Sequence, residues 1–303
     1  MPIELTDYKK KKLAIACSGG VDSMALAHMM AQKQKVIALI VNHNLRPAAK
    51  KEAAIAAKIL TQLGIENKIL EYKGKIPTKN IQEEARKIRY KLLTDYCKKH
   101  KIHTIATAHH ADDNAENFLL RLARGSGVDG LSAMKAESEI NGIKIIRPIL
   151  QFTKQELQNY LQSNKIKWVE DATNKTSKYK RNALRHVLDK LEDKELITKR
   201  INDASWHIAR VRDYLESETT KALAQVVGKN EINLRNFNNL HPEIAFRVLN
   251  SVIAKFSPKP KKPRAEEVLR LLDLLKNSQK RTLAGLIFTP KNGKVFITIE
   301  KLG

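Results

Sequence analysis

The sequence predicts an α/β protein with a doubly wound, mostly parallel sheet, followed by a helical linker and a small α+β domain. In the first half of the chain, short apolar segments alternate with amphipathic helical segments, which is typical of right-handed βαβ units. The first apolar segment runs directly into serines and glycines, as a strand does when it ends in a ligand-binding loop. The last third of the chain instead combines helical segments with two strands around an Asn-Gly turn.

Four strands are expected in the parallel sheet, at residues 13–17, 36–41, 68–71 and 104–108. Helices are expected between and after them, near residues 23–32, 52–63, 80–100 and 114–124. A capping box at Thr153 begins a further helix that ends near residue 163. Because ligands of such sheets bind beyond the carboxyl ends of the strands, the loops after the first, second and fourth strands form the candidate site.

The C-terminal part begins with a long helical region near residues 194–227. A helix near 238–255, a Pro/Lys linker at 257–263 and a helix at 265–275 are expected to follow. Two closing strands, at 282–288 and 294–300, would flank the Asn292-Gly293 turn. We therefore expect two domains, residues 1–210 and residues 211–303, with a polar, basic stretch at 168–185 in the first.

The composition favours a polyanionic partner, because a formal net charge of +24 gives the surface a positive potential. A general bias of composition towards lysine, asparagine and isoleucine is the plainer explanation, but the local clustering of Lys and Arg favours nucleic acid. Two cysteines are too few for a disulfide framework or a four-thiolate metal site. No apolar run reaches the ~18 residues of a membrane span and no signal peptide is evident, so we expect a cytoplasmic protein.

The loop after the first strand has the composition of a phosphate cradle. Glycines let the backbone approach an anion, the following helix offers free N–H groups, and serine hydroxyls add donors. Neither a Walker A loop nor a dinucleotide-binding fingerprint is present. An aspartate beside a phosphate needs a cation, so Asp22 predicts a Mg²⁺ ion. The loop consists of Ser18, Gly19, Gly20, Val21, Asp22 and Ser23.

The loops after the second and fourth strands carry further candidates. His43 and Arg46 could hold a phosphate or a base edge, although a solvated polar loop is the simpler explanation. Asp113 and Glu116 lie three apart at the start of a helix, where two carboxylates could hold Mg²⁺ or an ammonium group. Helix capping by acidic residues is the alternative for Asp112 and Asp113. A zinc or iron site including adjacent histidines is disfavoured, because neighbours on an extended segment point to opposite faces.

Several segments, taken in order along the chain, resemble the tRNA(Ile)-lysidine synthetases, a family of the N-type ATP pyrophosphatases or PP-loop proteins. The Ser-Gly-Gly-x-Asp-Ser loop alone would fit several ATP-dependent ligases, whereas the ordered set is specific. The C-terminal segment from Arg281 resembles the small tRNA-binding domain of that family, and the chain stops as shorter members do. The other matching segments are His43 with Arg46, Arg86 with Arg89 and Tyr90, and residues 108–131, 146–150 and 168–185. For Arg86 and Arg89, an ordinary charged helix face is the alternative.

The resemblance implies an enzyme that ligates lysine to C2 of the wobble cytidine of a tRNA(Ile) with anticodon CAU. ATP first adenylates the cytidine, and the ε-amine of free lysine then displaces AMP. Residues 1–210 would be the catalytic domain and 211–303 a helical linker with a tRNA-binding domain. The implied partners are ATP, Mg²⁺, L-lysine and tRNA(Ile), and a homodimer is compatible with the resemblance.

The resemblance also implies roles for particular residues. Catalysis would depend on Asp22, Asp113 and Glu116. ATP would bind to the loop from Ser18 to Ser23 together with His43 and Arg46, and Mg²⁺ would bind to Asp22. The residues expected to orient lysine or the metal are Asp112, Asp113 and Glu116, and those expected to bind tRNA are Arg124, Lys178, Lys180, Arg181 and Arg185.

The chain departs from the pattern of the family at Asn42, Asn114, Asn117 and Ala172, none of which removes a carboxylate of the candidate site. The residues alone are also compatible with two other functions. The chain could be another adenylating ligase with the same loop that acts on tRNA, or a basic RNA-binding protein with a non-catalytic nucleotide site. Loss of turnover without loss of tRNA affinity in an Asp22→Ala variant would distinguish an enzyme from a binding protein.

Overall fold

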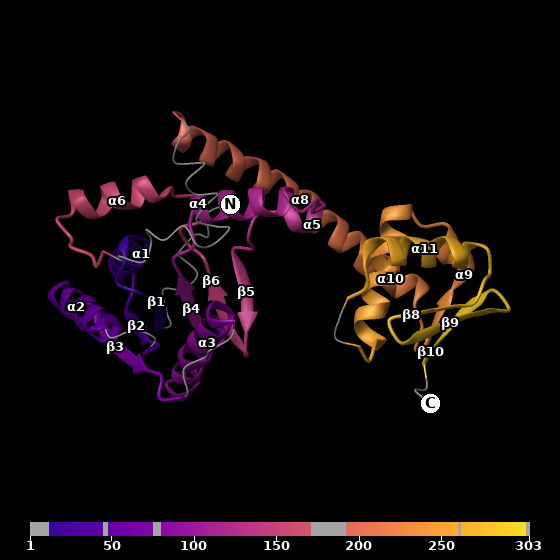
Figure 1. Ribbon diagram of the computed structural model, residues 1–303, viewed down its shortest axis with the longest axis horizontal. Coiled ribbons are helices and arrows are strands. Elements are labelled where there is room, and N and C mark those ends of the chain that lie inside the picture. Colours follow the sequence, from indigo (N-terminus) through magenta and orange to yellow (C-terminus); the bar gives the residue numbers. More distant parts are fainter. Residues whose placement is uncertain (1–11, 45–47, 75–79, 171–191, 260–261, 301–303) are drawn as a thin grey trace. The chain divides into compact units, whose positions relative to one another are not determined.

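The computed structural model describes residues 12–44, 48–74, 80–170, 192–259 and 262–300. The chain divides into two compact units, Met1–Ala209 and Arg210–Gly303, and the division falls inside helix α8 (Lys194–Val226). Figure 1 shows the α/β sandwich of the first unit and the smaller α+β fold of the second. No helix among the described residues is long and apolar enough to cross a membrane.

The first unit is built on a six-stranded sheet with the order β3-β2-β1-β4-β6-β5. All neighbouring strands are parallel except β5, which runs antiparallel to β6. The strands are β1 (Leu13–Cys17), β2 (Val36–Asn42), β3 (Glu66–Glu71), β4 (Thr104–Thr107), β5 (Glu137–Ile140) and β6 (Ile143–Ile146). The helices are α1 (Val21–Ala31), α2 (Ala48–Gln62), α3 (Ile81–Lys99), α4 (Ala111–Leu122), α5 (Val128–Leu131) and α6 (Lys154–Ser163).

Alternate residues of the strands form two apolar cores, one on each face of the sheet. Leu13, Ile15 and Cys17 of β1 pack with buried residues of α1, α2 and α6. Ala14 of β1 packs on the other face, with the buried residues of α3. The predicted doubly wound fold is therefore confirmed, with helices on both faces of a mostly parallel sheet.

The position of the candidate site follows from the strand order. Strand β1 pairs with β2 on one side and with β4 on the other, so the connections after β1 and β4 leave the sheet in different directions. A crevice forms at such a switch point, beyond the carboxyl ends of the strands. The loop at 18–20 and the loop at 108–110 both begin there.

Strands β5 and β6 are not among the elements expected from the sequence. They form a hairpin whose turn has positive φ at Asn141 (52°) and Gly142 (77°). This is the Asn-Gly signal that also marks the C-terminal hairpin. The capping box of α6 is confirmed, since the Glu156 N–H donates to Thr153 Oγ1 (3.2 Å) and the Thr153 N–H to Glu156 Oε2 (2.7 Å).

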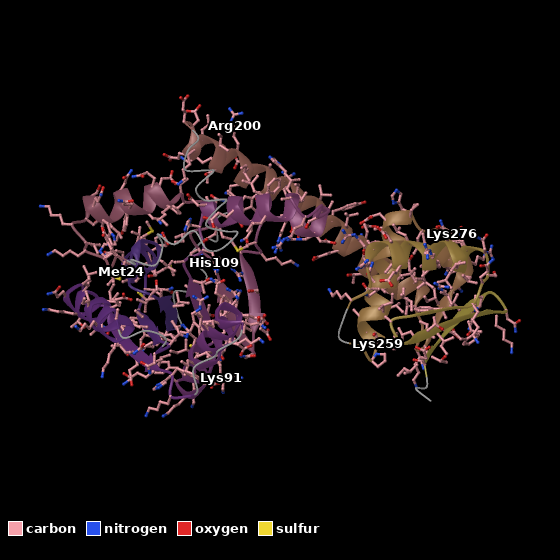
Figure 2. The ribbon with its side chains drawn as sticks, in the orientation of Figure 1. Met24, Lys91, His109, Arg200, Lys259 and Lys276 are labelled. Carbon is pink, nitrogen blue, oxygen red and sulfur yellow. The ribbon has the colours of Figure 1, made fainter. Side chains whose placement is uncertain are left out.

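The second unit has an antiparallel four-stranded sheet with the order β7-β10-β9-β8. Its core contains Phe237, Leu249, Leu271, Phe288 and Val295, all buried. Its strands are β7 (Glu231–Asn233), β8 (Arg281–Leu283), β9 (Leu286–Lys291) and β10 (Lys294–Ile299), and its helices after α8 are α9 (Leu234–Asn238), α10 (Pro242–Phe256) and α11 (Ala265–Lys276). Charged side chains such as Lys276 at the end of α11, and Lys91 on α3 of the first unit, lie on the surface (Figure 2).

Two expectations for this unit were wrong in detail. The strand expected at 282–288 is two strands, because Ala284 (φ 53°) and Gly285 (φ 76°) form a turn between β8 and β9. The helix expected from 238 begins only at Pro242, because proline fits the first position of a helix and the His241 side chain caps it. The turn expected at Asn292-Gly293 is confirmed, with positive φ at both residues.

Candidate active site

The loop from Ser18 to Ser23 is held in shape by its own serine side chains. The Ser18 N–H donates to Ser23 Oγ (3.1 Å), and Ser23 Oγ donates to the Gly20 carbonyl (3.1 Å). The two hydroxyl oxygens lie 3.2 Å apart. Ser23 is buried and Ser18 is exposed, so the inner serine fixes the loop while the outer hydroxyl is accessible to a ligand.

Gly19 cannot carry a side chain in this loop. Its φ is +87°, a region that L side chains rarely adopt, and an added Cβ would lie 2.7 Å from Ala56 Cβ and 3.2 Å from Val169 Cγ2. Its carbonyl accepts the Val169 N–H (2.9 Å). The loop is therefore packed tightly between α2 and the segment that precedes residue 171.

The start of helix α1 presents free N–H groups beside this loop. Gly20 is the N-cap of α1, and among the described residues the backbone N–H groups of Val21, Asp22 and Ser23 have no acceptor. Together with the positive end of the helix dipole, such groups bind anions such as phosphate. The predicted cradle thus has the geometry that phosphate binding needs.

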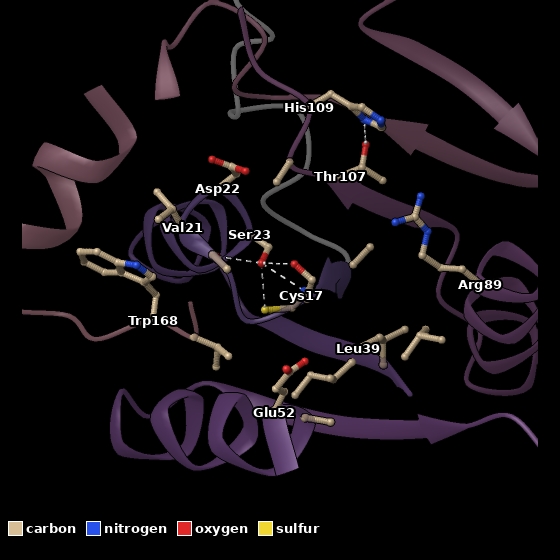
Figure 3. Close-up of a pocket in the computed structure, with 18 of the residues that line it drawn as sticks. Cys17, Val21, Asp22, Ser23, Leu39, Glu52, Arg89, Thr107, His109 and Trp168 are labelled. Carbon is tan, nitrogen blue, oxygen red and sulfur yellow. Dashed lines mark hydrogen bonds between the residues drawn. The ribbon is translucent and has the colours of Figure 1, made fainter. Parts of the chain in front are cut away.

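A cavity of about 780 Å³ opens beside the cradle (Figure 3). Its apolar lining includes Leu39 and Ile40 of β2, Ala53 of α2 and Trp168. Its polar lining includes the loop residues Ser18, Gly20, Asp22 and Ser23, and further His43, Glu52, Arg89, Thr107, His109, Asp113, Lys154 and Gln158. Such a cavity suits a ligand with an aromatic base and a charged tail.

Three carboxylates surround the buried imidazole of His110. Its Nε2 lies 3.6 Å from an oxygen of Asp22 and 3.6 Å from one of Asp113, and its Nδ1 lies 3.4 Å from Asp112 Oδ2 without hydrogen-bond geometry. Burial alone would lower the pKa of His110, but Asp112, Asp22 and Asp113 together raise it to about 10. In this arrangement His110 is an imidazolium ion that holds the phosphate loop and α4 together.

Asp112 and Asp113 have different surroundings. Asp112 Oδ2 accepts the Lys154 N–H at the start of α6 (2.8 Å). Burial opposes ionisation of Asp112, but His110 and this N–H lower its pKa below the ordinary value. Asp113 lines the cavity, whereas neither Asp112 nor the buried Glu116 does. Asp22 and Asp113 therefore line the cavity, whereas Asp112 connects α4 to the start of α6.

Asp22 fits the requirement of a Mg²⁺ ion. Its Oδ1 is buried and has no hydrogen-bond partner among the described residues. Mg²⁺ in phosphate sites takes one or two carboxylates, with phosphate and water oxygens completing its shell. No group of three His, Cys, Asp or Glu side chains that could hold a metal ion by itself is found in the described ranges.

Two of the other predicted residues, His43 and Arg124, lie in the described ranges, and only His43 is at the cavity. His43 lines the cavity, and burial together with the charge of Arg89 lowers its pKa. Arg124 is exposed after α4 and does not line the cavity. The remaining candidates lie outside the described residues: Arg46, Lys178, Lys180, Arg181 and Arg185.

The structure adds cavity residues that the sequence did not single out as site residues. Arg89 and Tyr90 line the cavity from α3. The alternative that the two arginines form an ordinary charged helix face therefore fits Arg86, which is exposed, but not Arg89. His109 also lines it, with Thr107 Oγ1 3.0 Å from its Nδ1. Burial and the nearby arginines outweigh Asp113 and lower the pKa of His109 to about 4, so its ring is neutral at pH 7. The Arg-x-x-Arg-Tyr spacing was the sequence pattern from which Arg89 could have been predicted as a site residue.

The fold and the loop define a PP-loop protein. Residues 3–192 match the family model of the PP-loop domain. The tRNA(Ile)-lysidine synthase of Wolbachia pipientis wMel is 41% identical over 278 residues, which are 88% of this chain and 64% of that protein. That of Rickettsia bellii (strain OSU 85-389) is 36% identical over 308 residues, 95% of this chain and 70% of that protein. The chain belongs to the tRNA(Ile)-lysidine synthase family.

The chain spans 64% of the length of the Wolbachia relative. Among solved structures, the U34-tRNA thiolase NcsA from Methanococcus maripaludis superposes with a TM-score of 0.55 at 22% identity, over 68% of this chain and 72% of that one. At that identity the likeness concerns the fold alone.

Proposed function

We propose that this chain uses ATP to ligate free lysine to C2 of the wobble cytidine of tRNA(Ile) with anticodon CAU. One observation carries the proposal: the phosphate cradle, the unpartnered oxygen of Asp22 and the carboxylate of Asp113 belong to one cavity region. Membership of the lysidine synthase family supports the choice of substrates. The product, lysidine, would pair with A instead of G and so change the codon read from AUG to AUA.

In the first step, the 2-oxygen of the cytidine attacks the α-phosphate of ATP and pyrophosphate leaves. The free N–H groups of α1 and the Ser18 hydroxyl would hold the phosphate chain, and the apolar wall with Trp168 would hold the adenine. Asp22, with Asp113 nearby, would hold Mg²⁺, which when bound supplies positive charge against the developing charge of pyrophosphate. His43, and Arg46 outside the described residues, are proposed phosphate contacts.

In the second step, the ε-amine of lysine attacks C2 and AMP leaves. A free lysine side chain has a pKa near ~10.4, so the amine must lose a proton before it attacks. We propose that Asp113 orients this amine. Asp112 and Glu116, which do not line the cavity, would instead stabilise the position of α4. Ionised carboxylates attract the ammonium form into the site, and desolvation there favours its neutral form.

The tRNA would bind through the basic surface of the chain. Arg124 is exposed near α4, and Lys178, Lys180, Arg181 and Arg185 belong to the basic stretch that the structure does not describe. We propose that this surface holds backbone phosphates near the splayed anticodon, and that residues 211–303 hold the tRNA elsewhere. A cytoplasmic location and a homodimer are also part of this proposal.

A sulfur-transfer enzyme of the same fold is the main alternative, and the cysteines argue against it. The chain contains two, Cys17 and Cys97, and both are buried. They belong to the cores on opposite faces of the sheet, so they cannot act together as a pair of thiols. A binding protein with an inert nucleotide site is the other alternative.

The test is incubation of the protein with ATP, Mg²⁺, labelled lysine and an unmodified tRNA(Ile) transcript with anticodon CAU. A methionine tRNA, which carries the same anticodon, is the control. Label in tRNA(Ile) alone is the expected result. Pyrophosphate release without label would indicate another acceptor, and no pyrophosphate release with either tRNA would favour the binding protein.

A further inference from the structure

A group of three arginines surrounds Tyr90 on the side of the cavity away from the phosphate cradle. The guanidinium carbons of Arg86 and Arg89 lie 5.0 and 5.4 Å from the centre of the Tyr90 ring. Arg147, which follows β6, is close enough to Arg86 and Tyr90 for both to affect its pKa. Figure 3 shows Arg89 extending from α3 on the same side as Thr107 and His109, opposite Asp22, Val21 and Trp168.

Among the residues that the structure describes, no carboxylate compensates these charges. Within the described ranges, none of the three arginines forms an ion pair with Asp or Glu. Arg147 donates to the Lys135 carbonyl (2.7 Å) and to Ser138 Oγ (3.1 Å), and its buried Nε has no partner. Burial lowers the pKa of Arg89, and the charge of Arg86 lowers it further. Arg89 and Arg147 are half-buried beside a third positive charge, and like charges that are partly buried without a counterion among the described residues are unfavourable, which indicates a site that is completed by an anionic ligand.

Arg89 is the member of the group that can contact such a ligand. It lines the cavity together with Tyr90, His43 and His109, whereas Arg86 is exposed on α3 and Arg147 does not line the cavity. A guanidinium binds a carboxylate through two parallel hydrogen bonds, which fixes both its position and its orientation. The charges of Arg86 and Arg147 would strengthen this interaction without contact.

We propose that Arg89 binds the α-carboxylate of the free lysine substrate. This inference rests on the proposed function, in which lysine is the one small substrate that carries a carboxylate. The phosphates of ATP have their own cradle across the cavity, where the N–H groups of α1 are free. The lysine would therefore extend between Arg89 and Asp113, which both line the cavity, with its carboxylate at the guanidinium and its reacting amine at the carboxylate of Asp113.

The test compares lysine with cadaverine, which is lysine without its carboxylate, as the amine that enters tRNA(Ile). In the variant Arg89→Gln we expect the KM for lysine to rise by about 10-fold or more, as for the loss of a charged hydrogen bond. The KM for ATP and the rate with cadaverine stay close to those of the unchanged protein. The preference for lysine over cadaverine therefore falls by the same factor.

Lys91→Gln is the matched control, since it removes a cation two residues along the same helix that is exposed and paired with Asp95. It should leave all three quantities unchanged. Arg89→Lys keeps the charge but not the bidentate geometry, so its KM for lysine should lie between those of the unchanged protein and Arg89→Gln. This variant replaces Arg89→Gln in the test if Arg89→Gln does not fold.

An equal loss with lysine and cadaverine, or a rise in the KM for ATP instead, would overturn the inference and assign Arg89 to a phosphate. Failure of the proposed function is recognised separately. In that case the unchanged protein transfers no lysine to tRNA(Ile), and the inference falls with it before any variant is compared.

Discussion

At the scale of single residues, the two glycines of the phosphate loop differ in what they tolerate. Gly19 has a left-handed φ and no room for a Cβ, whereas a Cβ at Gly20 would meet only Ser18 Oγ at 3.7 Å. We expect Gly19→Ala to lower the free energy of unfolding by about 1–3 kcal/mol, from backbone strain and overpacking. Gly20→Ala should change it by less than about 0.5 kcal/mol. Urea unfolding of both variants measures the difference, and equal effects would contradict the geometry.

Asp22 is expected to contribute to turnover and not to tRNA affinity. Asp22→Asn keeps the size of the side chain but removes the charge that would hold Mg²⁺. We expect lysine transfer to fall by at least about 100-fold, as when a group that stabilises transition-state charge is removed. The dissociation constant for tRNA(Ile), measured by filter binding, should stay within about 2-fold, since surface cations dominate that affinity. An unchanged transfer rate would exclude Asp22 from the chemistry.

The sequence predicted the position of the loop between β1 and α1 because the signal for it is local. Two glycines and an aspartate fall within the six positions that follow the strand, and this pattern can be recognised without reference to distant residues. Arg89 and His109 were harder to assign, because their place in the cavity depends on how α3 and β4 pack on the sheet. Asp112 illustrates a further limit, since the N–H that it binds belongs to Lys154, far along the chain.

At the scale of elements, the turn between β8 and β9 contains a residue under strain. Ala284 has φ 53°, and an L residue in this region costs roughly 1–2 kcal/mol. Glycine at this position removes the strain of the folded state, but it also makes the unfolded chain more flexible, which offsets part of the gain. We therefore expect Ala284→Gly to raise the free energy of unfolding by about 0.5–1 kcal/mol. Gly285→Ala should have the opposite sign, because a Cβ there would lie 3.1 Å from Pro258 Cγ. Thermal unfolding of the two variants tests both signs, and stabilisation by Gly285→Ala would contradict the turn.

The same turn explains why one strand was expected where there are two. The residues from 282 to 288 are mostly apolar or β-branched, and the single glycine does not by itself indicate a reversal. The reversal depends on Ala284 adopting a left-handed conformation, stabilised by the Ser257 hydroxyl, which donates to the Ala284 carbonyl (2.7 Å). Strongly periodic elements such as α3 were predicted to within a residue or two of their ends.

At the scale of the whole molecule, the sheet keeps the two thiols apart and unreactive. Burial raises the pKa of Cys97 to about 12 and also raises that of Cys17. Alkylation requires the thiolate, so both thiols should stay protonated at pH 8 and react only as the pH approaches these raised values. We expect no reaction with iodoacetamide at pH 8 in the native protein and two modified thiols after unfolding, counted by mass spectrometry. Rapid native modification at pH 8 would contradict the packing of the sheet.

The formal net charge of +24 is a property of the whole chain, and it predicts attraction to a polyanion such as tRNA without identifying the residues that bind it.

The alternation of strands and helices was sufficient to predict the layers of the first unit, because each apolar face has to be covered. The substrate could not be derived in the same way. Its choice depends on the order of motifs along the chain and on the relatives that share them.

We propose that ATP bound in the cavity is cleaved between its α- and β-phosphates and that transfer of lysine to the tRNA completes the reaction. The most direct test is the stoichiometry of products in the presence of lysine and tRNA(Ile), with ATP labelled at the α-phosphate to count AMP or ADP and, in a parallel reaction, at the γ-phosphate to count pyrophosphate or phosphate. We expect one AMP and one pyrophosphate for each lysine that enters the tRNA, and neither product with methionine tRNA. Formation of ADP and phosphate, or of AMP without lysine in the tRNA, would contradict the account.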